Sequence, residues 1–322
     1  MTGPAAWSTL ELAPLARLKS AALNPVLEEE IRSWRELFSW DYRTSADLVR
    51  HYIDIQILNG FALLEEGEAL GYSYFVIDEH KGLIGDLYVR QARRTPENER
   101  RLLEVVVDAL VRSPSVRRIE SQLMMLSVPG DAGLPHSDYA RAHLRNFMLA
   151  DLTAMPELPA GRAAGQVFIE HWAEHHHDEA ARVISAAYQG HIDSQINNQY
   201  NSIAGARRFL RNIVEYPGCG SFFAPASFLA FERGSAEACG MSLASLVAPD
   251  IGHITQICVL PRVQGTGVGY ELLRRSLGAL RGYGCRKVSL TVTATNDNAA
   301  RLYERVGFHT ARRFNALVWD GF

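Results

Sequence analysis

The sequence lacks features that are typical of several classes of protein. Only four cysteines occur among 322 residues, and they form no Cys-x-x-Cys pair, which argues against a disulfide framework or a zinc ribbon. No apolar run reaches the roughly 18–20 residues that a membrane-spanning helix requires. The first residues show no basic leader followed by an apolar block. A signal peptide is therefore not expected, and the protein is predicted to be cytoplasmic.

Neither positive nor negative charge is in large excess. The chain has 33 Lys+Arg against 36 Asp+Glu, a formal net charge of −3, whereas a dedicated nucleic-acid-binding domain is strongly basic. The hydrophobic content of 47% is ample for buried cores and argues against disorder. At about 100–200 residues per domain, this length predicts about two domains. Neither a nucleic acid nor a membrane is expected as a partner, and the oligomeric state stays open.

The order of the predicted elements repeats along the chain. In each half, periodicity predicts a strand, two helices, three strands, a helix with one apolar stripe, and further strands. The repeat predicts an α/β protein of two similar domains, 1–155 and 166–322, joined by the Pro/Gly/Ala-rich linker 156–165. Residues 1–160 carry a net charge of −6 and residues 161–322 a net charge of +3. This difference favours the second half as the host of an anionic ligand.

The most informative motif is a glycine-rich turn between a predicted strand and a predicted helix. Residues 259–269 read Val-Leu-Pro-Arg-Val-Gln-Gly-Thr-Gly-Val-Gly. Glycines let main-chain N–H groups approach a phosphate, and the following helix adds the positive end of its dipole. The spacing differs from the dinucleotide-binding fingerprint, and a P-loop would need Gly-Lys-Ser/Thr. On this motif alone, a purely structural turn stays an alternative.

A second motif follows the predicted strand 287–293. Residues 296–308 read Asn-Asp-Asn-Ala-Ala-Arg-Leu-Tyr-Glu-Arg-Val-Gly-Phe. In this order, the two motifs resemble the signatures of the GNAT family of N-acetyltransferases. The resemblance implies two GNAT-like domains, each a central, mostly antiparallel mixed sheet flanked by helices. It also implies transfer of an acetyl group from acetyl-CoA, as cosubstrate and without a metal, to a primary amine of an unidentified acceptor by direct attack.

The same resemblance assigns roles to single residues. The main-chain amides of the turn would hold the CoA pyrophosphate, and Asn296 and the strand before the turn would contact the pantetheine arm. Tyr303 matches the position of a general acid that protonates the departing thiolate. The implied cofactor-binding residues are Ile257, Cys258, Val259, Gln264, Gly265, Thr266, Gly267, Val268, Gly269 and Asn296.

The general base and the acceptor site are less determined. Family members often place a carboxylate on the strand before the turn, where this sequence has Thr255 and Gln256. His253, His191, Asp193, a water chain and the terminal carboxylate of Phe322 stay alternatives for the base. The polar stretch 188–200 is expected to contact the acceptor, with a solvated loop as the alternative. Its expected acceptor-binding residues are Tyr188, His191, Asn197 and Tyr200.

The first half is predicted to be a degenerate copy. After the strand 83–89, the sequence Arg-Gln-Ala-Arg-Arg-Thr-Pro (90–96) has side chains and a proline in place of the glycines. Residues 142–147 resemble the second motif only faintly and contain no tyrosine. Domain 1–155 is therefore not expected to bind CoA, with residual binding through the arginines as the alternative. These losses leave a non-catalytic acyl-CoA-binding sensor or scaffold as the alternative function.

Four histidines near the start of the second half invite comparison with a metal site. They are His171, His175, His176 and His177. Adjacent side chains at a helix start point in different directions, so we expect a solvent-exposed cluster and no metal site.

Overall fold

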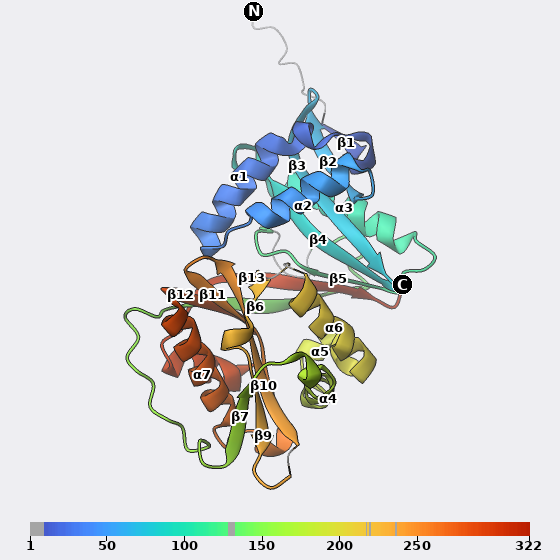
Figure 1. The fold of residues 1–322 in the computed structure, drawn as a ribbon. Coiled ribbons are helices and arrows are strands. Elements are labelled where there is room, and N and C mark those ends of the chain that lie inside the picture. Colours follow the sequence, from blue (N-terminus) through green and yellow to red (C-terminus); the bar gives the residue numbers. More distant parts are fainter. Residues whose placement is uncertain (1–9, 128–132, 217, 219, 236) are drawn as a thin grey trace, which may run out of the picture. The chain divides into compact units, whose positions relative to one another are not determined.

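The computed structural model describes residues 10–127, 133–216, 218, 220–235 and 237–322. Within these ranges the chain forms two compact units, each outlined in Figure 1. Unit 1 comprises Met1–Leu144 with Phe314–Phe322, and unit 2 comprises Arg145–Arg313. No helix in the described ranges combines the length and the hydropathy needed to cross a bilayer. Of the four cysteines, Cys219 lies outside the described residues.

Unit 1 is a mixed sheet with helices on both faces. Its strand order is β1-β2-β3-β4-β5-β13, antiparallel except for the parallel pair β4–β5. Helix α1 bonds to Tyr72 on one face of β3, whereas the apolar stripe of α3 packs with Phe75 on the other face. The elements are β1 (Leu10–Pro14), α1 (Ser20–Phe38), α2 (Arg43–Asp54), β2 (Asn59–Glu65), β3 (Glu68–Asp78), β4 (Lys81–Val89), α3 (Pro96–Val111), β5 (Arg118–Gln122) and β13 (His309–Asp320).

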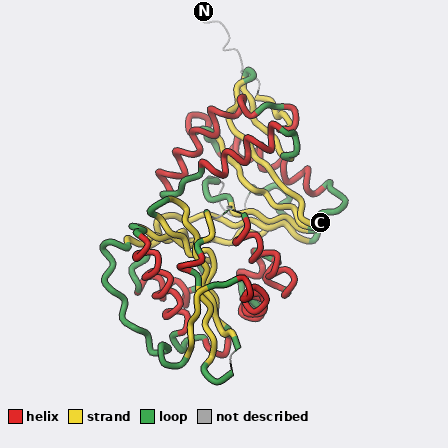
Figure 2. Tube along the Cα trace, in the orientation of Figure 1, coloured by secondary structure: helices red, strands yellow, loops and turns green. Residues whose placement is uncertain are grey.

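Unit 2 repeats this plan. Its strand order is β7-β9-β10-β11-β12-β6, with β11–β12 as the parallel pair, and Figure 2 shows its strands between α7 on one side and α4 and α6 on the other. The elements are β6 (Ala140–Asp151), β7 (Val167–His171), α4 (His177–Ala187), α5 (Asp193–Ile196), α6 (Ile203–Glu215), β8 (Ser221–Phe222), β9 (Phe228–Glu232), β10 (Ala238–Ala248), β11 (Ile251–Val259), α7 (Val268–Tyr283), β12 (Lys287–Thr293) and α8 (Asp297–Arg305).

Each sheet ends on a strand from the other half of the sequence. Strand β13 pairs antiparallel with β5, and its Leu317 and Trp319 are buried in the core of unit 1. Strand β6 pairs antiparallel with β12, and its Met148 and Ala150 are buried in the core of unit 2. The compact units therefore differ from the predicted domains 1–155 and 166–322. The reason is physical: main-chain pairing and apolar burial attach each exchanged strand to the distant sheet.

Both units contain the same irregularity beside their parallel pair. Thr255 is an extra residue on β11 opposite Leu243 and Ala244, and β4 has its extra residue at Gly85. The β11–β12 ladder ends at the pair Ile254–Leu290, although β11 continues to Val259. Beyond this pair, β11 and β12 are therefore splayed apart. The repeat is inexact, because residues 123–127 and 133–139 of unit 1 form turns where unit 2 has α8.

Unit 1 contains a buried network of two carboxyl groups and two tyrosines. The Tyr42 hydroxyl donates to Asp86 on β4 (2.6 Å), and the Tyr72 hydroxyl donates to Glu30 on α1 (2.7 Å). A further hydrogen bond joins the two carboxyl groups. Burial, and then the neighbouring Asp86, raises the pKa of Glu30 well above its usual range. The pair therefore retains a proton at pH values where free carboxyl groups have lost theirs.

The substitution Glu30→Gln should remove part of the pH dependence of stability. Because the pKa of Glu30 is raised in the folded state, the native protein keeps a proton that the unfolded chain loses above about pH 4.5. Wild-type stability should fall relative to the variant as the pH rises above this value, by up to about 1.4 kcal/mol per pH unit. Urea unfolding across pH 5–8 measures this, with Glu36→Gln at an exposed site of α1 as the control. Parallel pH profiles for wild type and Glu30→Gln would contradict the shared proton.

Candidate functional site

The glycine-rich turn leaves the start of α7 open to an anion. Gly265 (φ +73°) and Gly267 (φ +103°) adopt the left-handed conformation that favours glycine. Gly267 is the N-cap of α7 and makes no side-chain cap bond, and the first intrahelical bond runs from Glu271 N to Gly267 O (3.0 Å). The N–H groups of residues 268–270 therefore point out of the helix end. These groups and the helix dipole favour a phosphate at this place.

The end of β11 presents main chain toward the gap left by the splayed strands. Ile257, Cys258 and Val259 pair with β10 along one edge, beyond the point where the ladder to β12 has ended. Their other edge is thus available to an extended ligand, as predicted for the pantetheine arm. Burial raises the pKa of the Cys258 thiol to about 12. Cys258 is therefore protonated at neutral pH and is not suited to act as a nucleophile.

A glutamine and two tyrosines form a buried polar group next to the bulge. Gln256 Nε2 donates to the Tyr188 hydroxyl (2.7 Å), and the Tyr200 hydroxyl lies 3.4 Å from Gln256 Oε1. The rings of Tyr188 and Tyr200 stack with centroids 4.4 Å apart. Burial raises the pKa of both phenols. The predicted contact residues Tyr188 and Tyr200 are thus brought together with the strand position where family members often have an acid.

Unit 2 also contains a charged pair, Arg145 and Asp193. Asp193, at the start of α5, accepts hydrogen bonds from the Thr293 hydroxyl and from Arg145 Nη1 (3.4 Å). Arg145 also donates to Thr293 Oγ1 (3.2 Å) and Thr291 Oγ1 (3.1 Å), whereas its Nε is buried without a hydrogen-bond partner in the described structure. The side chains of Arg145 and Asp193 are 10% and 15% exposed. Because both side chains are largely buried, the charge of each interacts more strongly with nearby polar groups than it would in water.

Tyr303 on α8 belongs to the same site. Its side chain is buried, and burial raises the pKa of the phenol. Asp193 and Cys258 raise this pKa further, while Arg145 lowers it, so all three residues lie within electrostatic reach of Tyr303. A phenol with a raised pKa keeps its proton at neutral pH, which is the state that a proton donor requires.

Other predicted residues have local structural partners. Asn296 Oδ1 accepts from Ala299 N (3.3 Å) as the N-cap of α8, and its Nδ2 lies 3.3 Å from His191 Nε2. Asn197 Oδ1 likewise caps the following turn. His253 is buried against Ser289 (2.9 Å), and burial lowers its pKa to about 3, which makes it a weak and inaccessible base. Phe322 belongs to unit 1.

The sequence interpretation missed Arg145, Thr291 and Thr293. Residues 142–147 resemble the second motif faintly and were predicted to belong to the first domain, whereas residues 145–151 complete the sheet of unit 2. Thr291 and Thr293 alternate along β12 and so share one face, which is the signal that a period-two pattern offers. The pattern does not indicate their partner, because Arg145 is 148 residues away from Thr293.

The equivalent turn in unit 1 is occupied by its own side chains. Glu29 accepts from Gln91 N (2.6 Å), and Thr95 caps α3 through Asn98 N (3.2 Å). Glu99, buried in the first turn of α3, accepts from Ser127 N (3.0 Å). The start of α3 thus has a side-chain cap and begins with Pro96, which has no N–H, whereas Gly267 leaves the start of α7 without a side-chain cap. An incoming phosphate would meet fewer free main-chain donors in unit 1.

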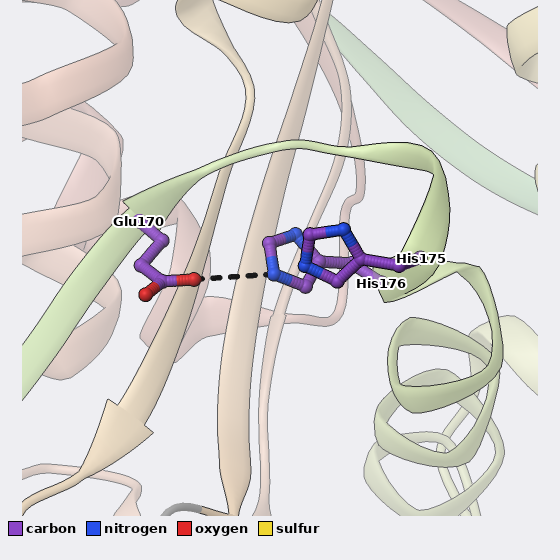
Figure 3. Close-up of side chains that lie close together, drawn as sticks. All are labelled: Glu170, His175 and His176. Atoms are coloured by element: carbon purple, nitrogen blue, oxygen red, sulfur yellow. Dashed lines mark hydrogen bonds and ion pairs between the residues drawn. The ribbon is translucent and has the colours of Figure 1, made fainter.

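The histidine run is not uniformly exposed. His176 is buried, and Figure 3 shows its ring beside His175 and directed at Glu170, with Nε2 and Oε2 3.2 Å apart. The expectation of a solvent-exposed cluster is therefore wrong for His176. Ligand atoms of these three residues lie within 4.8 Å of one another. However, His176 Nδ1 accepts from Ala173 N (3.1 Å), which places the ring proton on Nε2 and leaves it no lone pair for a metal.

Comparison with known proteins agrees with this geometry. Residues 196–308, which include the glycine-rich turn, Asn296 and Tyr303, match the sequence profile of the Acetyltransferase (GNAT) family. This part of the chain is similar to the GNAT family. The matched region contains the open helix end, the splayed end of β11 and the buried Tyr303.

Two curated relatives and one solved structure extend the comparison. The N-alpha-acetyltransferase MAK3 of Arabidopsis thaliana is 36% identical over 70 residues, 22% of this chain and 37% of that protein. The mycothiol acetyltransferase of Mycobacteroides abscessus is 30% identical over 161 residues, 49% of this chain and 51% of that protein. The matches thus span about half of these relatives or less. A GCN5-related N-acetyltransferase from Sphaerobacter thermophilus shares the fold over 97% of both chains, with a TM-score of 0.66 and 16% identity.

Proposed function

We propose that the protein is an N-acetyltransferase that moves an acetyl group from acetyl-CoA to a primary amine. The observation that carries this proposal is the combination, within unit 2, of the uncapped glycine-rich helix start and the buried Tyr303, which lies within electrostatic reach of Asp193. The first feature suits a pyrophosphate, and the second suits proton transfer at a thioester. Gly267 and Tyr303 both lie in the region 196–308 that matches the GNAT family, which supports this proposal.

The proposed cofactor site extends from α7 to β11. Residues 264–269 would bind the pyrophosphate through main-chain amides, and residues 257–259 would bond the pantetheine arm along the free edge of β11. Bound acetyl-CoA supplies the acetyl group as a thioester. Asn296 already caps α8, so we assign any contact with pantetheine to its Nδ2.

The proposed reaction is direct attack of the amine on the thioester carbonyl. Asp193 binds the acceptor as an ammonium ion, which gives one proton to solvent water before its nitrogen forms the new C–N bond. When the C–S bond breaks, Tyr303 gives its phenolic proton to the thiolate, and the second proton that the nitrogen loses on becoming an amide restores the phenol. Arg145 and Thr293 hold the Asp193 carboxylate in place. These steps leave acetylated amine and free thiol.

The burial of the site favours a small acceptor. Tyr188 and Tyr303 are buried, and Asp193 is largely so, which suits an enclosed pocket better than an open groove for a protein surface. The relatives' names offer two acceptor classes: an α-amine for the N-alpha-acetyltransferase and a mycothiol-related amine for the mycothiol acetyltransferase. A panel of small amines should therefore contain both free peptide α-amines and mycothiol-related amines.

Release of free CoA thiol in the presence of such a panel tests the proposal. Amino acids, short peptides, amino sugars and polyamines would be compared with their N-acetylated forms as matched non-acceptors. We expect at least one amine to give thiol release and a product heavier by one acetyl group. CoA binding without transfer to any amine would favour the alternative of a non-catalytic acyl-CoA-binding protein.

Asp193→Asn should weaken use of the acceptor while sparing the cofactor. Asparagine keeps the size and an acceptor for the Thr293 hydroxyl, but it loses the charge that attracts an ammonium ion. We expect kcat/KM for the amine to fall by about 10- to 100-fold, the range for a partly buried charged contact. Acetyl-CoA affinity, measured by calorimetry, should change less than twofold. Asp178→Asn, at an exposed ion pair, is the control, and an equal loss there would contradict the role of Asp193.

Unit 1 is proposed to lack CoA binding. Helix α3 begins with Pro96 and is capped by Thr95, so fewer main-chain donors are free for a phosphate than at the start of α7, which supports this part of the proposal. The contribution of this half of the sequence to the site is instead β6, which carries Arg145.

A further inference from the structure

The segment between β6 and β7 runs along α7 and is bonded to it. The Tyr270 hydroxyl donates to Pro159 O (2.8 Å), Gly161 N donates to Glu271 Oε2 (3.1 Å), and Arg281 Nη2 donates to Met155 O (2.7 Å). Ala163 is fully buried in the core of unit 2. These contacts fix residues 155–163 against the helix that begins at the glycine-rich turn. The predicted linker is therefore part of the wall of the cofactor site.

Arg162 in this segment contacts the turn itself. Its guanidinium donates to the carbonyl oxygens of Gly265 and of Thr266 (Nε, 3.0 Å). A Cβ on Gly267 would lie 3.1 Å from Arg162 Cγ, so the stem of the arginine packs over the middle glycine. Among the described residues, its bonds are to main-chain carbonyls and not to a carboxylate. Within the part of the chain that the structure describes, the positive charge of Arg162 therefore has no carboxylate partner, unlike that of Arg274, which is bonded to Glu271 (2.6 Å).

The direction of these bonds determines what the arginine does. In a trans peptide the C=O and N–H groups point in opposite directions. A guanidinium bonded to the carbonyls of residues 265 and 266 therefore lies behind the turn, and the N–H of Gly267 points to the other side. Donation to a carbonyl polarises the peptide and strengthens its N–H as a donor. The positive charge of Arg162 also attracts an anion that binds on the opposite side of the peptide group.

We propose that Arg162 is a positioning residue for the pyrophosphate of acetyl-CoA. It fixes the carbonyl side of the turn and places a positive charge behind the amides that face the phosphates. This inference rests on the proposed function and adds a residue outside both sequence motifs. It assigns to the segment between the two halves a direct part in cofactor affinity.

Calorimetric titration of the full-length chain with CoA and with dephospho-CoA tests the proposal. Arg162→Gln keeps amide donors but removes the charge, and Arg162→Lys keeps the charge. We expect Arg162→Gln to raise the Kd about 5- to 10-fold at low salt, in line with one partly screened charge. Both ligands should be affected alike, because both contain the pyrophosphate. Arg162→Lys should bind within about twofold of wild type, and high salt should narrow the gap between wild type and Arg162→Gln.

The outcomes separate this inference from the proposed function. Arg207→Gln, on α6 in the same unit, removes an equal charge from an exposed ion pair and should leave the Kd unchanged. Equal weakening by the Gln and Lys variants, or a loss insensitive to salt, would overturn the electrostatic role. So would wild-type affinity in Arg162→Gln. If the wild-type chain binds neither ligand, the proposed function itself fails.

Discussion

Gly267→Glu should abolish acetyl-CoA binding. The residue has φ +103°, so any side chain is strained there, and its Cβ would lie 3.1 Å from Arg162 Cγ. A glutamate also places negative charge at the N-cap of α7, where the pyrophosphate would lie. Strain, obstruction and repulsion act together, so we expect affinity to fall by at least about 100-fold, equivalent to about 2.7 kcal/mol. Calorimetry with acetyl-CoA measures the loss.

The matched control is Gly278→Glu on the same helix. Gly278 is exposed, and a Cβ there meets nothing within 4 Å, so the same substitution adds the same charge without obstruction. It should bind acetyl-CoA as wild type does. Thermal unfolding of both variants separates loss of the site from loss of the fold. Normal binding by a folded Gly267→Glu protein would remove the glycine-rich turn from the cofactor site.

Tyr303→Phe should lower turnover and leave cofactor affinity intact. The substitution removes one hydroxyl from a buried side chain and keeps its packing against Phe308. Because a general acid contributes about 100- to 10,000-fold, we expect kcat to fall by about 100-fold or more. The Kd for acetyl-CoA should stay within about twofold, since Tyr303 is assigned to the leaving sulfur and not to the phosphates. Initial rates with an acceptor found in the amine panel, together with calorimetry, measure both quantities.

The pH profile adds an independent readout for Tyr303. Burial raises the pKa of its phenol, so the donor stays protonated across the usual assay range. Wild-type kcat should therefore show no alkaline decline from this group below about pH 10. Tyr283→Phe, at an exposed tyrosine near the end of α7, is the control and should leave kcat and its pH profile unchanged. Turnover of Tyr303→Phe within threefold of wild type would show that another group protonates the thiolate.

The local parts of the site were predictable because short segments determine them. Gly265 and Gly267 take conformations that few other residues tolerate, and an apolar stripe places α7 directly after them. The strand 287–293 was likewise predicted with its observed bounds. In these elements, the period of the apolar residues and the turn chemistry act within a few residues of each other.

The remaining parts depend on contacts that no short window contains. The buried residues 316–319 of β13 form a pattern that could pair with many strands. Only the complete fold determines that their partner is β5. Arg145 stands in an ordinary strand pattern, and its role arises from Asp193 and two threonines far along the chain. The burial that disqualifies His253 as a base is equally a property of the assembled sheet.

The exchange of β6 and β13 links the two halves of the sequence. Expressed alone, residues 166–322 would have β12 without its outer neighbour and β13 without the strand it pairs with. The first half alone would likewise leave β5 without β13. Main-chain groups and apolar side chains that are paired and buried in the whole chain would then be exposed to water. Each half therefore depends on the other for its fold, whichever of them binds the cofactor.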